Sequence, residues 1–348
     1  MARFFSHGAF AGLSALCLLL VLAAPAPAGA QAPPPADEAL RQRFEALQSA
    51  TVGLEVRAVE GAASASTLGR QREGTGVVIE PQGLVLTIGY LVLEAERVEI
   101  TTRGQAKVPG QVVAYDAVTG LGLVKPLFPL AGVQPARLGS AASLAKGTPL
   151  LFITGMAPRQ AGAVRLMDTR AFTGYWEYHL DSALYTAPPV FNHSGAGLFN
   201  AQGELVGVGH LVMRDVMPED VPEVAPGNLF VPVDVLGPVI DELLRTGANP
   251  QARRPWLGVN AMQMDGHVRI TRVTEGSAAQ AAGLRPGHWV LAVDGETVST
   301  LEAFYKKVWS HRADDGAIRL RVLEGPVTRV IEVPVRERGE AMARPKGV

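Results

Sequence analysis

The sequence predicts a mainly β protein with more than one folded domain. From residue 51 onward, short β-like runs alternate with turns that contain Gly, Pro or Asp, which is the pattern of an all-β barrel or sandwich. The 348 residues include 38 glycines and 25 prolines, and only 6% are aromatic, a composition that suits a turn-rich β protein. Two folded domains are expected for a chain of this length.

The first 30 residues have the composition of a secretory signal peptide. Arg3 gives the positive start, residues 9–24 the apolar core, and residues 28–30 (AGA) the small-residue cleavage site. The alternative is an uncleaved anchor, but the apolar run is short for a membrane span and breaks at Pro25. We therefore expect a periplasmic or secreted protein without stable membrane insertion after cleavage. The only cysteine, Cys17, lies in this segment, so no disulfide is expected afterwards.

A Pro/Ala-rich tether and a short helix are predicted at residues 31–48. Within 38–48, Leu40, Phe44 and Leu47 fall on one face of a helix, which is the spacing of an amphipathic element. We expect this face to pack on the domain that follows.

Two consecutive sets of strands are predicted within residues 49–246. The first set comprises 52–59, 74–79, 84–87, 97–101, 107–115 and 121–124. The second comprises 149–153, 163–172, 175–180, 197–199, 204–212 and 227–232, followed by a helix at 233–245. Two six-strand sets are what a double β-barrel needs.

Several segments of this region resemble the HtrA-type, trypsin-like serine proteases. Residues 73–79 (EGTGVVI) and 83–87 (GLVLT) resemble the strands before the catalytic histidine, and 112–119 (VVAYDAVT) resembles the turn before the catalytic aspartate. Residues 191–198 (FNHSGAGL), followed by ELVGVG at 204–209, resemble the nucleophile loop. The resemblance implies a chymotrypsin-like double β-barrel with Ser194 as nucleophile and an oxyanion site at the N–H groups of Asn192 and Ser194. It also leaves a homo-trimer open, with Phe44 at its centre.

A second domain is predicted after a polar linker at 247–255. Residues 256–338 resemble a PDZ domain, with WLGV at 256–259 as the carboxylate-binding loop and VTEGSAAQAAGLRPG at 273–287 as its core. The resemblance implies that C-terminal peptides or unfolded proteins add a strand to this domain. The N–H groups of Leu257, Gly258 and Val259 would hold the peptide carboxylate. Residues 339–348 are expected to form a flexible tail.

Two of the three catalytic positions of the family are replaced. Tyr90 stands at the histidine position and Gly120 at the aspartate position, while Asn192 replaces a glycine of the nucleophile loop. No histidine occurs between residues 31 and 178, which include the whole first barrel. A phenol with a pKa of ~10 cannot be the usual base at neutral pH.

His210 allows two interpretations. It either forms a rewired pair with Ser194 as base, or fills the pocket vacated at Gly120 and hydrogen-bonds to Tyr90 or backbone. The first interpretation implies an active serine endopeptidase of envelope protein quality control. The second implies a proteolytically inactive homologue that acts as a peptide-binding, misfolded-protein-binding or regulatory protein.

Charge and motifs argue against other classes of function. The formal net charge is −1, which does not favour nucleic acid or an anionic membrane surface. The histidines are scattered, and no Gly-rich phosphate loop follows a strand into a helix. We therefore expect no metal and no cofactor.

Overall fold

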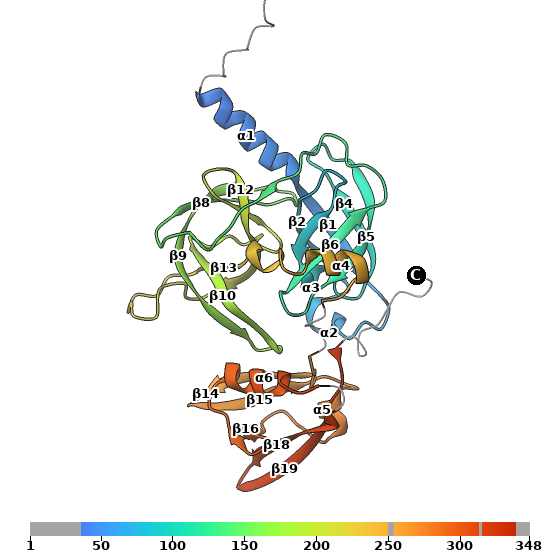
Figure 1. The fold of residues 1–348 in the computed structure, drawn as a ribbon, viewed down its shortest axis with the longest axis vertical. Helices are drawn as coiled ribbons and strands as arrows, with labels where there is room; N and C mark the ends of the chain where they lie inside the picture. Colours follow the sequence, from blue (N-terminus) through green and yellow to red (C-terminus); the bar gives the residue numbers. More distant parts are fainter. Residues whose placement is uncertain (1–35, 250–253, 313–314, 339–348) are drawn as a thin grey trace, which may run out of the picture.

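The computed structural model describes residues 36–249, 254–312 and 315–338. Two β-barrels lie side by side, and a third domain lies against one end of the pair (Figure 1). The predicted mainly β fold is confirmed. The predicted signal peptide, most of the tether and the tail at 339–348 lie outside the described residues.

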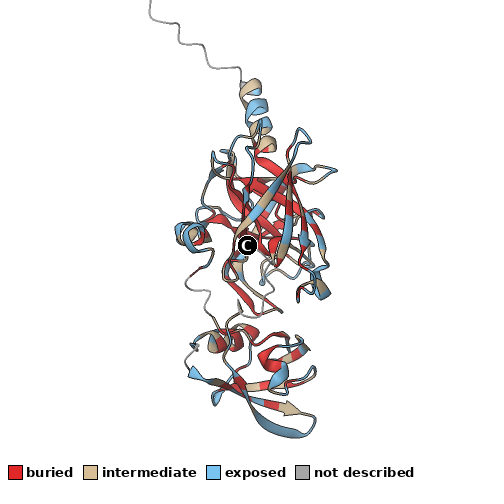
Figure 2. Ribbon diagram, turned by 90° about the vertical axis from the view of Figure 1, so that its right-hand side faces the viewer, coloured by how far each residue is buried: buried red, intermediate tan, exposed pale blue. Residues whose placement is uncertain are grey.

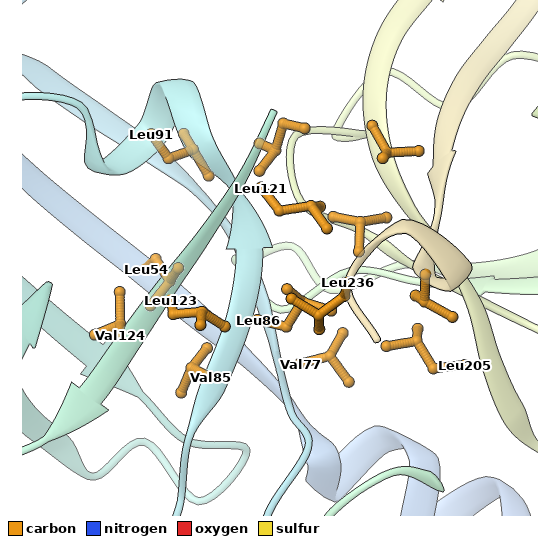
Figure 3. Close-up of a cluster of buried hydrophobic side chains, with 14 of the residues drawn as sticks. Leu54, Val77, Val85, Leu86, Leu91, Leu121, Leu123, Val124, Leu205 and Leu236 are labelled. Atoms are coloured by element: carbon orange, nitrogen blue, oxygen red, sulfur yellow. The ribbon is translucent and has the colours of Figure 1, made fainter. Parts of the chain in front are cut away.

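The first barrel is closed by six strands in the order β1-β2-β3-β6-β5-β4. Its strands are β1 (Thr51–Ala58), β2 (Gln71–Val78), β3 (Val85–Ile88), β4 (Ala95–Thr101), β5 (Lys107–Tyr115) and β6 (Leu121–Pro126). Two short helices, α2 (Ala65–Leu68) and α3 (Gly89–Val92), lie at the end that faces the third domain (Figure 1). Leu54, Leu86 and Leu123 fill the barrel interior (Figure 3), and their burial is the main stabilising term.

The second barrel is a ring of six strands in the order β11-β8-β9-β10-β13-β12, closed by the pairing of β11 with β12. A short strand, β7, pairs in parallel with the start of β12. The bounds are β7 (Arg137–Leu138), β8 (Pro149–Ile153), β9 (Ala161–Gly174), β10 (Tyr178–Ala187), β11 (Gly197–Phe199), β12 (Glu204–Met213) and β13 (Gly227–Pro232).

Two predicted elements of the second barrel have different bounds in the structure. The strand expected at 175–180 is instead the β9–β10 turn followed by the start of β10, because β9 continues to Gly174 before the chain reverses. The helix expected at 233–245 is divided into a 3₁₀ helix, η1 (Val233–Val235), and α4 (Ile240–Thr246). Gly237 and Pro238 lie in the gap, and neither residue favours helix continuation.

Helix α1 (Ala36–Ala50) contacts the barrels only through its C-terminal half. Phe44 and Leu47 pack against the core, whereas Leu40 is 65% exposed. The prediction that Leu40 also packs on the next domain is therefore wrong. The physical reason is visible in Figures 1 and 2, where the helix projects beyond the barrels and its N-terminal turns are largely exposed.

The third domain is a six-stranded sheet covered by two helices. Its main order is β14-β15-β16-β18-β19, with β17 paired to β16, so β14 is an edge strand. The bounds are β14 (Val259–Met264), β15 (His267–Val273), β16 (Trp289–Val293), β17 (Glu296–Thr297), β18 (Ala317–Glu324), β19 (Val327–Pro334), α5 (Ala278–Ala281) and α6 (Leu301–Trp309).

Helix α6 begins and ends where local chemistry favours it. The Thr300 side chain caps its start by accepting from the Ala303 N–H, and Lys306 and Lys307 lie in its last turn. Phe304 and Tyr305 are buried under the sheet. No helix within the described ranges is both long enough and apolar enough to span a membrane.

Asn228 on β13 fastens the loop that leads to Ser194. Its buried amide oxygen accepts from the Val190 N–H at 2.6 Å, and its Nδ2 donates to the Val190 carbonyl at 2.9 Å and to the Leu211 carbonyl at 3.2 Å. The loop is thus anchored immediately before the turn that carries the serine.

We expect Asn228→Ala to destabilise the chain by about 2–4 kcal/mol, because buried backbone groups lose their partners. Urea unfolding of the variant against wild type measures this loss. Gln202→Ala, at an exposed turn, is the control and should change stability by less than about 0.5 kcal/mol. A loss for Asn228→Ala as small as that of the control would contradict the anchoring role.

Candidate active site between the barrels

The loop that carries Ser194 is held between the two barrels by its backbone. The Thr75 N–H donates to the Ser194 carbonyl at 2.8 Å, and the Gly195 N–H donates to the Gly209 carbonyl at 2.8 Å. Gly195 has φ 75°, and a Cβ atom added there would lie 1.9 Å from the Thr75 carbonyl oxygen. Only glycine fits this position.

The Ser194 hydroxyl is hydrogen-bonded to Tyr90. The Tyr90 Oη lies 2.7 Å from Ser194 Oγ and 3.1 Å from the His210 carbonyl oxygen. A phenol has one proton, so both contacts are satisfied when Tyr90 donates to the His210 carbonyl and Ser194 donates to Tyr90. The residue at the family's histidine position therefore does contact the serine.

Tyr90 is a poor base in this environment. Burial raises the pKa of Tyr90 to about 12, against a smaller opposing effect of its hydrogen bond with Ser194. The phenol therefore stays protonated at neutral pH and cannot take the proton of the serine hydroxyl.

The space beside Gly120 is filled by Tyr178 from the second barrel. A Cβ atom at Gly120 would lie 2.5 Å from the Tyr178 Oη, and this hydroxyl donates to the Thr119 carbonyl at 2.8 Å. The expectation that His210 fills this space is therefore wrong. Asp116, the remaining acid of the turn, is buried and accepts hydrogen bonds from the Val118 N–H and the Thr119 hydroxyl.

His210 lies in a cage of aromatic rings. It stacks on Tyr90 at 5.8 Å between ring centroids and meets the edges or faces of Phe172, Trp176 and Tyr178 at 5.4–6.3 Å. Neither ring nitrogen has a hydrogen-bond partner among the described residues. The rewired pair with Ser194 is therefore not formed, and the expected hydrogen bond to Tyr90 is made by the His210 carbonyl instead of its ring.

The environment of His210 also makes it a weak base. The side chain is 3% exposed, and burial, with a smaller effect of nearby His193, lowers the pKa of His210 to about 3. The imidazole is therefore neutral at neutral pH. Its low pKa also means that it binds a proton only weakly and is a poor general base.

The N–H groups predicted for an oxyanion belong to Asn192 and Ser194. Within the described part of the chain, neither donates to a backbone acceptor, and Asn192 is exposed. Both N–H groups thus have no backbone partner in the part of the chain that the structure describes.

A cavity of ≈ 330 Å³ opens beside Tyr90 and His210. The barrels contribute Tyr90 and His210, the β9–β10 turn contributes Trp176, and the third domain contributes Asn260 and Arg272. The third domain therefore forms part of the wall of this cavity.

The predicted carboxylate-binding loop already holds a carboxylate. The N–H groups of Leu257, Gly258 and Val259 donate to the side chain of Glu177 at 3.0, 2.8 and 3.0 Å. Sequence reasoning gave no role to Glu177, which lay inside a wrongly predicted strand, or to Tyr178. No local motif marks either residue, because both act through contacts far away in the sequence.

We expect Gly120→Ala to cost about 2–4 kcal/mol, because the residue needs φ 76° and meets the Tyr178 ring. In a Tyr178→Leu background the same change should cost only about 1–2 kcal/mol, the part due to backbone conformation. A double-mutant cycle by urea unfolding measures the difference. Equal costs in the two backgrounds would show that Tyr178 does not occupy the space.

We expect His210→Phe to make the free energy of unfolding less dependent on pH. The pKa of His210 is lowered in the folded state to about 3, so only the unfolded chain binds this proton as pH falls below about 6.5, and stability is lost at ~1.4 kcal/mol per pH unit. Between about pH 7 and 5 the variant should gain about 2 kcal/mol relative to wild type. His267→Phe, at an exposed position, is the control. A pH-independent difference would contradict the buried, neutral state of His210.

Comparisons with known proteins agree with this architecture. A trypsin-like peptidase domain model matches residues 74–208, and a PDZ domain model matches residues 269–312. "Putative serine protease HhoA" of Synechocystis sp. is 26% identical over 284 residues, which are 73% of this chain and 68% of that protein. "Probable periplasmic serine endoprotease DegP-like" of Chlamydia pneumoniae is 24% identical over 290 residues, 75% of this chain and 54% of that protein.

Solved structures have the same fold at low identity. "HtrA-type protease AlgW with decapeptide" has a TM-score of 0.51 and 18% identity, and the match covers 86% of this chain and 98% of that one. A serine endoprotease from Yersinia pestis has a TM-score of 0.51 and 18% identity, covering 85% and 97%. The chain spans 68% and 54% of the two curated relatives above. The chain thus combines a trypsin-like double barrel with a PDZ domain, and it is similar to serine proteases of the HtrA type.

Proposed function

We propose that this HtrA-type chain is a periplasmic peptide-binding protein whose PDZ domain takes C-termini and whose Ser194 centre is proteolytically inactive. The observation that carries the proposal is the hydrogen bond of Ser194 to the Tyr90 phenol at 2.7 Å. A serine hydroxyl needs a base that accepts its proton at neutral pH, and this phenol does not.

Neither His210 nor position 120 supplies that base. The His210 ring makes no hydrogen bond to Ser194, and no carboxylate stands at Gly120 to orient an imidazole. Where the catalytic groups are missing, binding and the oxyanion site alone leave ~10³–10⁴-fold acceleration over water. Such a residual rate is far below that of an intact triad.

The PDZ domain has the donors that a C-terminal peptide requires. The N–H groups of Leu257, Gly258 and Val259 converge on a carboxylate, and β14 is an edge strand able to accept an added strand. A structural neighbour of the HtrA type was solved with a decapeptide. These features support C-terminal peptides or unfolded proteins as partners, and a regulatory role through them.

The proposed location rests on the N-terminus and on a relative. Residues 1–30 have the charge and apolar pattern of a signal peptide, and a relative from Chlamydia pneumoniae carries a periplasmic name. A homo-trimer stays a prediction from the family resemblance. In this single chain Phe44 packs partly against its own core.

A second candidate is an active serine endopeptidase with an unusual base. The observation that favours it is the retained nucleophile loop, in which Gly195 keeps its left-handed conformation and the Ser194 N–H has no backbone acceptor among the described residues. For His210 to act, its ring would have to leave the aromatic cage and reach Ser194.

Reaction with a fluorophosphonate probe distinguishes the two candidates. We expect purified chain lacking residues 1–30 to label at least about 10³-fold more slowly than an active HtrA protease. Ser194→Ala gives the background, and His210→Ala tests the alternative base.

Fast labelling that both substitutions abolish would establish a Ser194–His210 nucleophile and refute the inactive centre. Fast labelling that only Ser194→Ala abolishes would equally refute it and point to another base. Labelling at the Ser194→Ala level supports the proposal.

A further inference from the structure

The carboxylate-binding loop of the PDZ domain is occupied by a side chain from the second barrel. Gly258 and Val259 donate their N–H groups to one oxygen of Glu177, and Leu257 donates to the other. Glu177 lies at the end of the β9–β10 turn and is only 3% exposed. In this conformation all three N–H groups are engaged with Glu177, so they cannot also bind the carboxylate of a peptide.

The turn also makes the backbone contact of an added strand. Ala261 on β14 donates its N–H to the carbonyl of Tyr175 at 2.8 Å, two residues before Glu177. Tyr305 of α6 donates its hydroxyl to the same carbonyl at 3.0 Å. A carboxylate in the loop and an upstream carbonyl bonded to the edge strand are the two contacts by which strand addition recognises a chain terminus. Residues 175–177 therefore imitate a bound peptide.

The position of Glu177 carries two energetic costs, a left-handed backbone conformation and the burial of its carboxyl group. Glu177 has φ 58°, a left-handed conformation that is unfavourable for a residue with a Cβ and persists only where surrounding contacts fix it. Burial raises the pKa of Glu177, while Arg338 and the three N–H donors act in the opposite direction. Arg338 also donates to the Trp176 carbonyl at 3.0 Å. The turn is therefore fixed by several independent contacts with the PDZ domain.

We propose that residues 175–177 are an internal ligand of the PDZ groove, and that a C-terminal peptide binds only by displacing Glu177. The inference rests on the proposed peptide-binding function and adds its regulation. A tethered ligand acts at a high effective concentration. The apparent affinity of an external peptide is then its intrinsic affinity multiplied by the fraction of molecules in which the groove is free. The partners selected are chain ends with a free carboxylate and an extended backbone.

Displacement of the turn would also change the cavity beside Tyr90 and His210. Trp176, between the two bonded residues, lies edge-on to His210 at 5.7 Å and stacks on Tyr178 at 5.6 Å. Trp176 and Tyr175 both line the cavity. Peptide binding in the groove and access to Tyr90 and His210 are therefore linked, because both depend on the position of one turn.

The test compares wild type with Glu177→Gln in the full chain after signal removal. Glutamine keeps the shape, but its amide nitrogen cannot accept from the N–H groups and its charge is gone, so the internal ligand is weakened. Glu275→Gln, at an exposed glutamate of the PDZ domain, is the control. The probe is a pooled library of hexapeptides with free carboxyl ends, and the same library with amidated ends shows that capture requires the carboxylate.

We expect Glu177→Gln to capture at least about tenfold more free-acid peptide than wild type or Glu275→Gln, and no variant to retain the amides. Equal capture by all three chains would refute the internal ligand while leaving peptide binding intact. No capture by any of them would refute the proposed peptide-binding function itself.

Amide hydrogen exchange gives a second measurement that needs no peptide. In wild type, Leu257, Gly258 and Val259 should exchange slowly because their N–H groups are bonded to Glu177, and in Glu177→Gln they should exchange at least about tenfold faster. Unchanged exchange at these three amides, in a variant with wild-type unfolding, would overturn the proposal.

Discussion

The burial of the Glu177 carboxylate under three N–H donors is the contact on which the arrangement of the domains depends. A buried charge is costly unless it is fully hydrogen-bonded, and here each donor comes from the first residues of the PDZ domain. Together with the bonds of Tyr175 to Ala261 and Tyr305, this contact holds the PDZ domain against the second barrel. It also explains why the PDZ domain forms a wall of the cavity beside Tyr90 instead of standing apart.

The neighbours of Glu177 join the remaining parts of the molecule. Tyr178 reaches the first barrel, where its hydroxyl bonds to the Thr119 carbonyl and its ring takes the space beside Gly120. Trp176 packs on His210 of the second barrel. Three consecutive side chains thus contact three different domains. HtrA-type proteases have an acid at the position of Gly120 and an imidazole at that of Tyr90. In this chain the same region is filled by packed aromatic side chains, which do not transfer protons at neutral pH.

The sequence predicted those features that depend on local pattern. The strands, the Ser194 loop, and Tyr90 at the position beside the serine follow from short motifs, whose glycines and alternating apolar residues determine the backbone. The strand expected at 175–180 failed because Tyr and Trp favour strands, while the turn there is fixed by contacts with the PDZ domain. Tyr178 and Glu177 act across 59 and 80 positions of sequence, and no pattern in one chain marks such pairs.

The persistence of the serine motif has a structural explanation that is independent of catalysis. The Ser194 carbonyl accepts from Thr75 of the first barrel, and Gly195 donates to Gly209 of the second, so the loop joins the barrels through its backbone. Asn228 holds the same loop from the other side. A chain without a base near Ser194 would still need this turn, because replacing Gly195 would place a Cβ atom 1.9 Å from a carbonyl oxygen. The motif is therefore evidence for the fold, and the partner of the serine hydroxyl is the evidence that bears on activity.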